Sequence, residues 1–235
     1  MLFQIIITKK IVENKIHVTG CVKVLIENGA QVNARDKQGR TPLYYATNYS
    51  TADSVRMLLE NEANINVLDI NSKSSALHGI DDEEKIKVLI EFGANVNAID
   101  DQGWTPLHSI LSTGTRNCAK ILIDNGADLT AKDNDGQSPL FKAAKEGNVE
   151  CLQLLIENKA NVNEKDKDGQ TPLLIAAKQG YAECLQLLTE SNANDNETDK
   201  SGRTALQVVE ENLANDCENE ENFRQCHDLL ISASN

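Results

Sequence analysis

Residues 132–164 read KDNDGQSPLFKAAKEGNVECLQLLIENKANVNE, and residues 165–197 read KDKDGQTPLLIAAKQGYAECLQLLTESNANDNE. Aligned without a gap, the two stretches are identical at 22 of 33 positions. A fixed period of this length is typical of repeat proteins, in which each copy is one structural unit packed against its neighbours. The 235 residues are therefore predicted to form one elongated array of such units.

An earlier copy shows how each unit is expected to fold. Residues 36–39 predict a turn, because their final glycine adopts positive φ at no steric cost. Thr41 can cap the following helix through its hydroxyl, and Pro42 suits the first helical position, where a backbone N–H would have no partner. Leu43 and Ala46 are expected to face the core, and a second helix with apolar residues at helical spacing follows.

The period, together with Thr171-Pro172-Leu173 and Ala176-Ala177, resembles the ankyrin repeat. The resemblance implies an all-α solenoid of stacked helix-turn-helix units joined by β-hairpin-like turns. The predicted units are an N-terminal cap with a half repeat (1–34), repeats at 35–67, 68–98, 99–131, 132–164 and 165–197, and a C-terminal capping repeat with an acidic insertion (198–235).

Repeat 68–98 is irregular. Its turn lacks the glycine and proline and is one residue longer than the others, and Leu77 precedes Leu89 by 12 positions, whereas Leu43 precedes Leu58 by 15. Nearly one helical turn is therefore predicted to be missing near Gly79. This difference is either tolerated drift or a local change in curvature that shapes a binding surface.

Two further irregularities lie near the C-terminus. Asp195 occupies a position that is apolar in the other repeats, so we expect a weak junction with a buried, unpaired carboxylate. Leu206 precedes Leu230 by 24 positions, and the acidic extra residues around 213–222 predict a solvated loop.

The net charge of −13 argues against nucleic acid and anionic membranes as partners, because both repel an acidic chain. No apolar run reaches the roughly 18–20 residues that span a bilayer. In residues 1–10 the positive charges follow the apolar run, so this segment is interpreted as a cap rather than a signal peptide. A set of acidic residues on the second helices is expected to form a solvated outer face: Glu60, Glu91, Asp124, Glu150, Glu157, Glu183 and Glu190.

Five of the six cysteines share one position in the repeat. Cys118, Cys151 and Cys184 are spaced 33 residues apart, and each precedes a leucine by four residues, as do Cys21 and Cys226. They are interpreted as small buried core residues kept reduced in a cytoplasmic compartment. A metal-binding ladder is the alternative, although the spacing matches no zinc motif. Cys217 lacks the following leucine and is expected to be exposed.

No catalytic, cofactor-binding or metal-binding motif is recognisable, so the protein is predicted not to be an enzyme. His78 and His108 fall at the histidine position of the family's Thr-Pro-Leu-His motif, where the resemblance implies a structural hydrogen bond. The predicted function is recognition of another protein by a monomer through the concave face of the array. The alternatives are a regulatory inhibitor or secreted effector made of repeats, or a fragment of a larger enzyme or multidomain protein.

By resemblance, the binding face holds the variable positions of the turns and of the first-helix ends. The predicted partner-binding residues are Lys37, Gln38, Arg40, Asn48, Tyr49, Asp101, Gln102, Trp104, Ser112, Thr113, Gln137, Lys145, Gln170, Lys178 and Arg203. Trp104, the only tryptophan, is the leading candidate because Trp, Tyr and Arg dominate binding hot spots. Alternatively, its ring lies flat on a neighbouring turn. Arg40, Tyr49 and Trp104 are expected to form one patch beside the shortened repeat.

Overall fold

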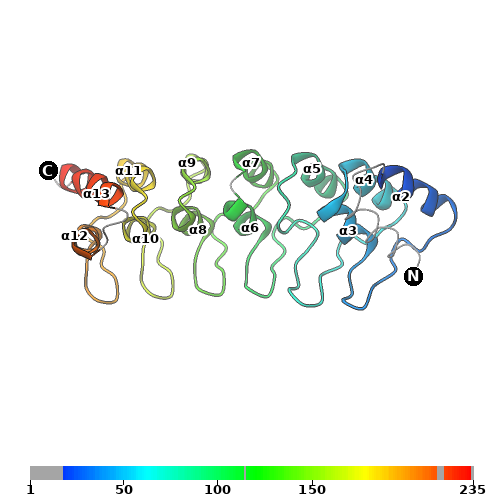
Figure 1. Cartoon of the computed structure of the whole chain (residues 1–235), viewed down its shortest axis with the longest axis horizontal. Helices are drawn as coiled ribbons and strands as arrows, with labels where there is room; N and C mark the ends of the chain where they lie inside the picture. Colours follow the sequence, from blue (N-terminus) through cyan, green and yellow to red (C-terminus); the bar gives the residue numbers. More distant parts are fainter. Residues whose placement is uncertain (1–17, 114, 216–219, 234–235) are drawn as a thin grey trace. The chain divides into compact units, whose positions relative to one another are not determined.

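The computed structural model describes residues 18–113, 115–215 and 220–233, and the described chain contains twelve α-helices and no β-strand (Figure 1). The helices are α2 (Val18–Glu27), α3 (Pro42–Tyr49), α4 (Ala52–Glu60), α5 (Glu83–Glu91), α6 (Pro106–Thr113), α7 (Arg116–Asp124), α8 (Pro139–Glu146), α9 (Val149–Glu157), α10 (Pro172–Gln179), α11 (Ala182–Glu190), α12 (Ala205–Asn215) and α13 (Glu220–Ala233). The predicted all-α fold class is confirmed.

The chain divides into two compact units, residues 1–110 with 120–127 (unit 1) and residues 111–119 with 128–235 (unit 2).

Each repeat pairs a short first helix with a second helix. In unit 2 the first helices α8, α10 and α12 pack against one another, and the second helices α9, α11 and α13 form another layer (Figure 1). The first helices begin as predicted. The hydroxyl of Thr41 accepts a hydrogen bond from the Tyr44 N–H at the start of α3, and Pro42 occupies the first turn. Ser138 and Thr171 cap α8 and α10 in the same way.

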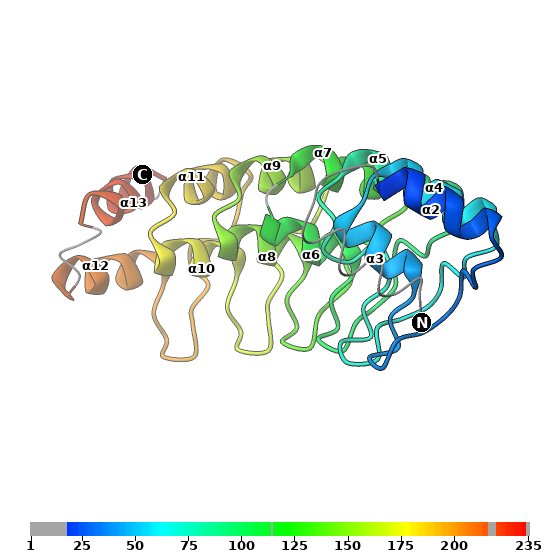
Figure 2. The ribbon, with the colours of Figure 1, turned by 45° about the vertical axis from the view of Figure 1, so that its right-hand side comes forward.

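The loops between repeats project away from the helices, and we call them fingers (Figure 2). Their tips are residues 36–40, 69–74, 100–104, 133–137, 166–170 and 199–203. The first tip is closed by hydrogen bonds from the Asp36 N–H to the Arg40 carbonyl and from the Gly39 N–H back to the Asp36 carbonyl. An aspartate begins every tip, and its Oδ1 accepts a hydrogen bond from the backbone N–H two residues later.

The irregular repeat contains a single described helix. A hydrogen-bonded turn at residues 76–79 stands where the other repeats have a first helix, and α5 follows it. Its finger tip is closed by a bond from the Asp69 N–H to the Ser74 carbonyl, one residue further along than in the other tips. Lys73, with φ of 55°, takes the left-handed conformation that glycine adopts elsewhere. The predicted loss of a helical turn and the longer loop are both confirmed.

The carbonyls at the ends of several first helices are satisfied by a side chain from the following repeat. Lys85 is only 8% exposed, and its Nζ donates a 2.9 Å hydrogen bond to the Thr47 carbonyl in the last turn of α3. In unit 2, the Asn148 and Asn212 side-chain amides donate to the carbonyls of Leu111 and Lys178. These bonds replace partners that the helix itself cannot provide.

The cysteines lie where the repeat frame predicted. Cys118, Cys151, Cys184 and Cys226 are buried, Cys21 is half-buried, and all five are free thiols. Burial raises the pKa of Cys151 and Cys226 to about 11 and that of Cys184 to about 12. Cys217 and the predicted N-terminal cap at residues 1–17 lie outside the described residues.

Two expectations for the C-terminal repeats differ in part from the structure. Asp195 is only half-buried, and its carboxylate accepts a 2.9 Å hydrogen bond from the Asn196 side chain, so the carboxylate keeps its solvation and a partner. The predicted loop is helical at residues 213–215 and 220–222, because α12 continues to Asn215 and α13 begins at Glu220, and residues 216–219 lie outside the described part of the chain. Glu220 and Glu221 occupy the first turn of α13, where acidic side chains favour helix formation through the helix dipole.

Candidate protein-interaction site

The most elaborate side-chain cluster of unit 1 joins the first finger to α3. The Asp36 carboxylate accepts a 2.6 Å hydrogen bond from the Tyr45 hydroxyl and a 3.1 Å bond from Arg40 Nε. Its other oxygen accepts bonds from the Gln38 and Arg40 backbone N–H groups. The finger is thereby fixed to the side of the helix, and Arg40 is held in one position.

An aromatic row extends from this anchor. The guanidinium of Arg40 lies 5.3 Å from the centre of the Tyr45 ring and 5.6 Å from that of Tyr44, distances typical of cation–π contacts. Tyr44 meets Tyr45 edge to face at 5.5 Å, and Tyr49 lies 6.3 Å beyond Tyr45. Tyr45 is buried, whereas Tyr49 is 53% exposed at the end of α3. The row therefore places a supported but solvent-accessible ring on the surface.

The ionisation of this cluster follows from its geometry. Burial and the hydrogen bond to Asp36 raise the pKa of Tyr45 to about 12. For Asp36, burial favours the neutral acid, but the bonds from Tyr45, Arg40 and Gln38 outweigh it and lower the pKa. The phenol is therefore neutral and the carboxylate charged at neutral pH.

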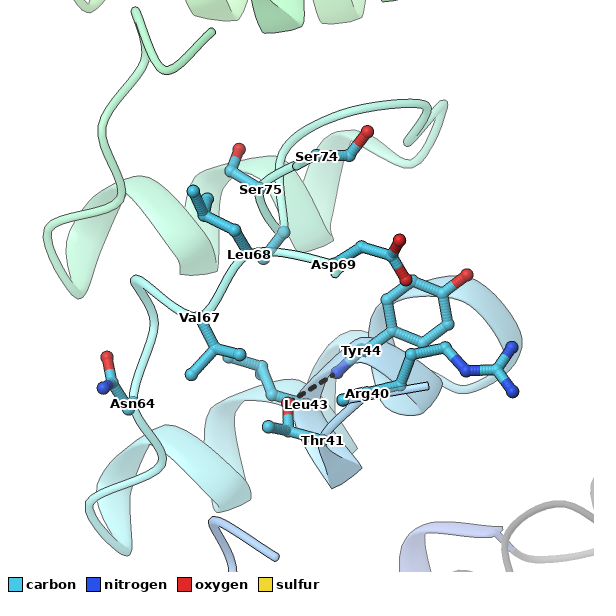
Figure 3. Close-up of a pocket in the computed structure, with 12 residues that line it drawn as sticks. Arg40, Thr41, Leu43, Tyr44, Asn64, Val67, Leu68, Asp69, Ser74 and Ser75 are labelled. Carbon is cyan, nitrogen blue, oxygen red and sulfur yellow. Dashed lines mark hydrogen bonds between the residues drawn. The ribbon is translucent and has the colours of Figure 1, made fainter. Parts of the chain in front are cut away.

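A small hollow lies beside the cluster, between the first two fingers (Figure 3). Arg40, Thr41, Leu43 and Tyr44 line one side, and residues 67–69 and 74–76 line the other. In Figure 3 the Arg40 and Tyr44 side chains extend together from the start of α3. The hollow has a volume of about 10 Å³, close to the space that one water molecule needs. A small-molecule ligand does not fit, so the exposed surface is the candidate site.

Trp104 lies at the tip of the next-but-one finger of unit 1. It is half-buried rather than exposed as its turn position suggested.

Both histidines of the repeat motif contact backbone or hydroxyl groups. The Trp104 carbonyl oxygen lies 3.0 Å from His78 Nε2, while His78 Nδ1 is 2.9 Å from the Ser75 hydroxyl. His108 is fully buried beside the Thr105 hydroxyl. The structural hydrogen bonds predicted for the two histidines are therefore present.

The other predicted binding residues differ in exposure. Exposed residues are Lys37, Gln38, Asn48, Asp101, Gln102, Ser112 and Lys178, and half-buried residues are Lys145, Gln170 and Arg203. Gln137 is buried, and its side-chain oxygen accepts a hydrogen bond from Lys145, so its side chain is not exposed to a partner as predicted. The side chain of Thr113 lies outside the described part of the chain.

Sequence reasoning missed Tyr45 as part of this cluster. Its contact with Asp36 depends on how the finger folds back on the helix, which no local pattern specifies. The clustering of tyrosines could have indicated this site, since Tyr44, Tyr45 and Tyr49 are three of the four tyrosines in the chain.

Neither a metal site nor a membrane span is found in the described chain. No group of three or more His, Cys, Asp or Glu side chains is arranged there to hold a metal ion. Within the same residues, no helix combines the length and apolar character needed to cross a bilayer.

All seven acidic residues predicted on the second helices are exposed.

Family models identify the repeats independently. A model described as ankyrin repeats (3 copies) matches residues 11–69 and 73–166, and one described as ankyrin repeats (many copies) matches residues 155–209. The chain belongs to the ankyrin repeat family. Both matching models describe ankyrin repeats, a protein-interaction fold, and neither describes a catalytic domain.

Similar proteins share this repeat region. A putative ankyrin repeat protein of Acanthamoeba polyphaga mimivirus is 36% identical over 90 residues, covering 37% of this chain and 12% of that protein. The B-cell lymphoma 3 protein homolog of Mus musculus is 31% identical over 101 residues, covering 40% of this chain and 22% of that protein. A probable serine/threonine-protein kinase of Dictyostelium discoideum is 36% identical over 96 residues, covering 37% of this chain and 11% of that protein. The aligned regions thus cover small parts of these longer proteins.

The fold is also seen in a crystal structure of the ankyrin repeat domain of Bcl-3, described as a member of the IkappaB protein family. The TM-score is 0.75 at 24% sequence identity, covering 98% of this chain and 97% of that chain. At this identity the likeness establishes the fold alone.

Proposed function

We propose that this ankyrin repeat chain is a non-catalytic module that binds another protein through the surface of unit 1 around Arg40 and Tyr49. The observation that carries the proposal is the aromatic row, in which a 53% exposed tyrosine is supported by a buried one. An exposed ring whose position is already fixed loses little conformational entropy on binding. Tyr and Arg are also the residue types that dominate interface hot spots.

The polar side chains around the row suit a protein partner. Asn48 is exposed next to Tyr49 in the sequence, and Lys37 and Gln38 are exposed on the finger tip that contains Arg40. These side chains can form the hydrated rim that usually surrounds an interface hot spot. The acidic character of the whole chain does not favour nucleic acid. The buried thiols support a reducing, cytoplasmic compartment. Trp104, Asp101 and Gln102 remain predicted contributors from the later finger.

The test is to place a photo-crosslinking amino acid at position 49 and identify the protein captured from cells of the source organism. The affinity of that protein is then measured for the wild type and for Tyr49→Ala. We expect a loss of about tenfold, because truncating a hot-spot tyrosine costs more than about 1 kcal/mol.

Tyr181→Ala is the matched control, since Tyr181 is another partly exposed tyrosine, in unit 2. It should leave the affinity unchanged. Equal affinities of the wild type and Tyr49→Ala would remove the proposed surface, and turnover of a substrate abolished by a point substitution would contradict the non-catalytic assignment.

A further inference from the structure

A second surface of unit 1 departs from the repeat pattern at the residue that precedes the aspartate of each finger. Aligned on that aspartate, this position holds Arg35, Leu68, Ile99, Lys132, Lys165 and Thr198. Two consecutive fingers therefore carry aliphatic side chains where the others carry charged or polar ones. Leu68 is 42% exposed and Ile99 is 63% exposed.

The lysines at this position in unit 2 have a structural use that explains their type. Lys132 Nζ donates to the Lys165 carbonyl and lies 3.4 Å from the Glu164 carboxylate. Lys165 Nζ in turn lies 2.5 Å from the Glu197 carboxylate. These contacts tie neighbouring repeats together at the surface. Leu68 and Ile99 can make no such ion pair. Because both side chains are exposed, packing in the core does not explain the aliphatic residues at these positions either.

The two side chains line a common groove with a volume of about 300 Å³. Its wall is entirely uncharged and consists of Ile65, Asn66, Leu68, Ser75, Ala76, Ala94, Asn95, Asn97, Ala98 and Ile99. A volume of this size is at the lower end of those found for ligand sites. It suits one or two aliphatic side chains of an incoming segment.

Polar groups in the same wall are free to bind a peptide backbone. Among the described residues, the Asn66 side-chain amide has no hydrogen-bond partner, and the Asn95 amide uses only its oxygen, on the Asn97 N–H. An extended segment offers unpaired backbone N–H and C=O groups to such amides, whereas a helix has already satisfied most of its own. In an extended segment, alternate side chains point the same way about 7 Å apart.

Size and charge decide between the possible occupants. Two partly exposed aliphatic side chains cannot supply the area of roughly 1,000 Å² or more that a stable dimer of this chain requires. A charge of −13 favours basic residues on either side of the segment that binds. We infer that this groove binds an extended segment of a partner protein that presents two aliphatic side chains, at alternate positions, between basic residues.

The experiment titrates the full chain into a fluorescein-labelled peptide, Lys-Lys-Val-Thr-Val-Thr-Lys-Lys, and follows its anisotropy. The double variant Leu68→Thr, Ile99→Thr should weaken binding at least tenfold, because two apolar contacts are lost. Threonine stands at this position in the last repeat, as Thr198, so the variant is expected to fold. A peptide with serine in place of valine should bind at least tenfold more weakly than the parent.

Ile70→Thr is the matched control. Ile70 is 60% exposed on the same finger as Leu68 but lies over Gly39 and does not line the groove, so the variant should bind as the wild type does. Methyl NMR spectra should show peptide-dependent shifts at Ile65, Leu68 and Ile99. Tyr49→Ala should retain peptide binding, which separates this inference from the function proposed above.

Several results would overturn the inference. Unchanged affinity of the double variant would remove the groove, and so would methyl shifts confined to residues outside it. Concentration-dependent dimerisation that the double variant abolishes would show that a second copy covers the groove instead. Equal binding of a lysine-only peptide would reduce the interaction to charge.

Discussion

At the residue scale, the position of the proposed recognition surface depends on one carboxylate. Asp36 binds the hydroxyl of Tyr45, the guanidinium of Arg40 and two backbone N–H groups of its own finger. Because a carboxylate can accept about four hydrogen bonds, Asp36 is fully used. Tyr49 gains its support indirectly, through the ring that this bond fixes.

The titration of Tyr45 gives a prediction at high pH. Its pKa in the folded protein is about 12, above the ordinary value of 10.0, so folding favours the neutral phenol. The stability that this group contributes is complete below pH 10 and is lost as the pH rises towards 12. Urea denaturation should therefore show a steeper loss of stability between pH 10 and 12 for the wild type than for Tyr45→Phe.

Ultraviolet absorbance checks the assignment directly. Tyr45 should ionise near pH 12 in the folded protein, and Tyr45→Phe should remove that step. Tyr49→Phe, which changes an exposed ring, serves as the control and should leave the late step in place. A late step that survives in Tyr45→Phe would mean that another tyrosine carries it.

At the scale of the helix pair, the irregular repeat shows how the fold tolerates the loss of a first helix. A single turn at residues 76–79 replaces it, yet α5 still packs against α4. Lys85 on α5 reaches back to the Thr47 carbonyl at the end of α3. A cation at a helix C-terminus is favoured by the helix dipole as well as by the hydrogen bond itself.

Replacing Lys85 by methionine should show the value of this contact. Methionine retains most of the apolar stem but removes the charge and the hydrogen bond, leaving the Thr47 carbonyl without this donor. We expect the free energy of unfolding to fall by about 1–3 kcal/mol, measured by urea denaturation.

Lys87→Met is the control on the same helix. Lys87 is exposed and pairs with Glu84 in solvent, so its replacement should change the stability by less than about 1 kcal/mol. Equal effects of the two substitutions would show that the bond to Thr47 contributes no more than a surface ion pair.

At the scale of the whole molecule, the chain comprises two compact units of unequal regularity. Unit 1 contains the repeat that lacks a first helix, whereas unit 2 contains the two repeats that are identical at 22 of 33 positions. In repeat proteins, stability is close to a sum of terms for single repeats and for their neighbouring interfaces. Unit 1 is therefore expected to be the less stable of the two.

Two probes report the units separately. The tyrosine cluster gives a near-ultraviolet circular dichroism signal from unit 1, and the buried thiols Cys118, Cys151, Cys184 and Cys226 belong to unit 2. In rising urea, the tyrosine signal should be lost before these four thiols become reactive towards a maleimide. Coincident transitions would show that the chain unfolds as one cooperative body.

The regular part of the fold could be predicted from the sequence because its causes are local and recur. Thr41, Ser138 and Thr171 each cap a helix through contacts within four residues, and the cysteines follow the repeat period. The shortened repeat was also predictable, since a missing turn changes the spacing of Leu77 and Leu89.

The remaining features depend on contacts that no local pattern records. The bond of Tyr45 to Asp36 spans nine residues and forms only when the finger folds onto α3. Gln137 occupies a position that varies between repeats, yet it is buried and its side-chain oxygen accepts a hydrogen bond from Lys145 on α8. The groove at Leu68 and Ile99 was missed because each residue alone resembles an ordinary exposed aliphatic side chain. Its significance is clear only when both line one hollow.

The hydrogen bonds that complete these helix ends all run the same way along the sequence, with the donor in a later repeat and the acceptor in an earlier one. The carbonyls of Thr47, Leu111 and Lys178 each receive a side-chain donor from a residue 34 to 38 positions later. The ribosome releases the earlier repeat first, so the carbonyl groups at the end of each of these helices gain their side-chain donors only after the following repeat has been made. Shortening the protein from its C-terminus should therefore disturb the last repeat that remains, whereas shortening from the N-terminus removes acceptors and leaves no such helix end exposed.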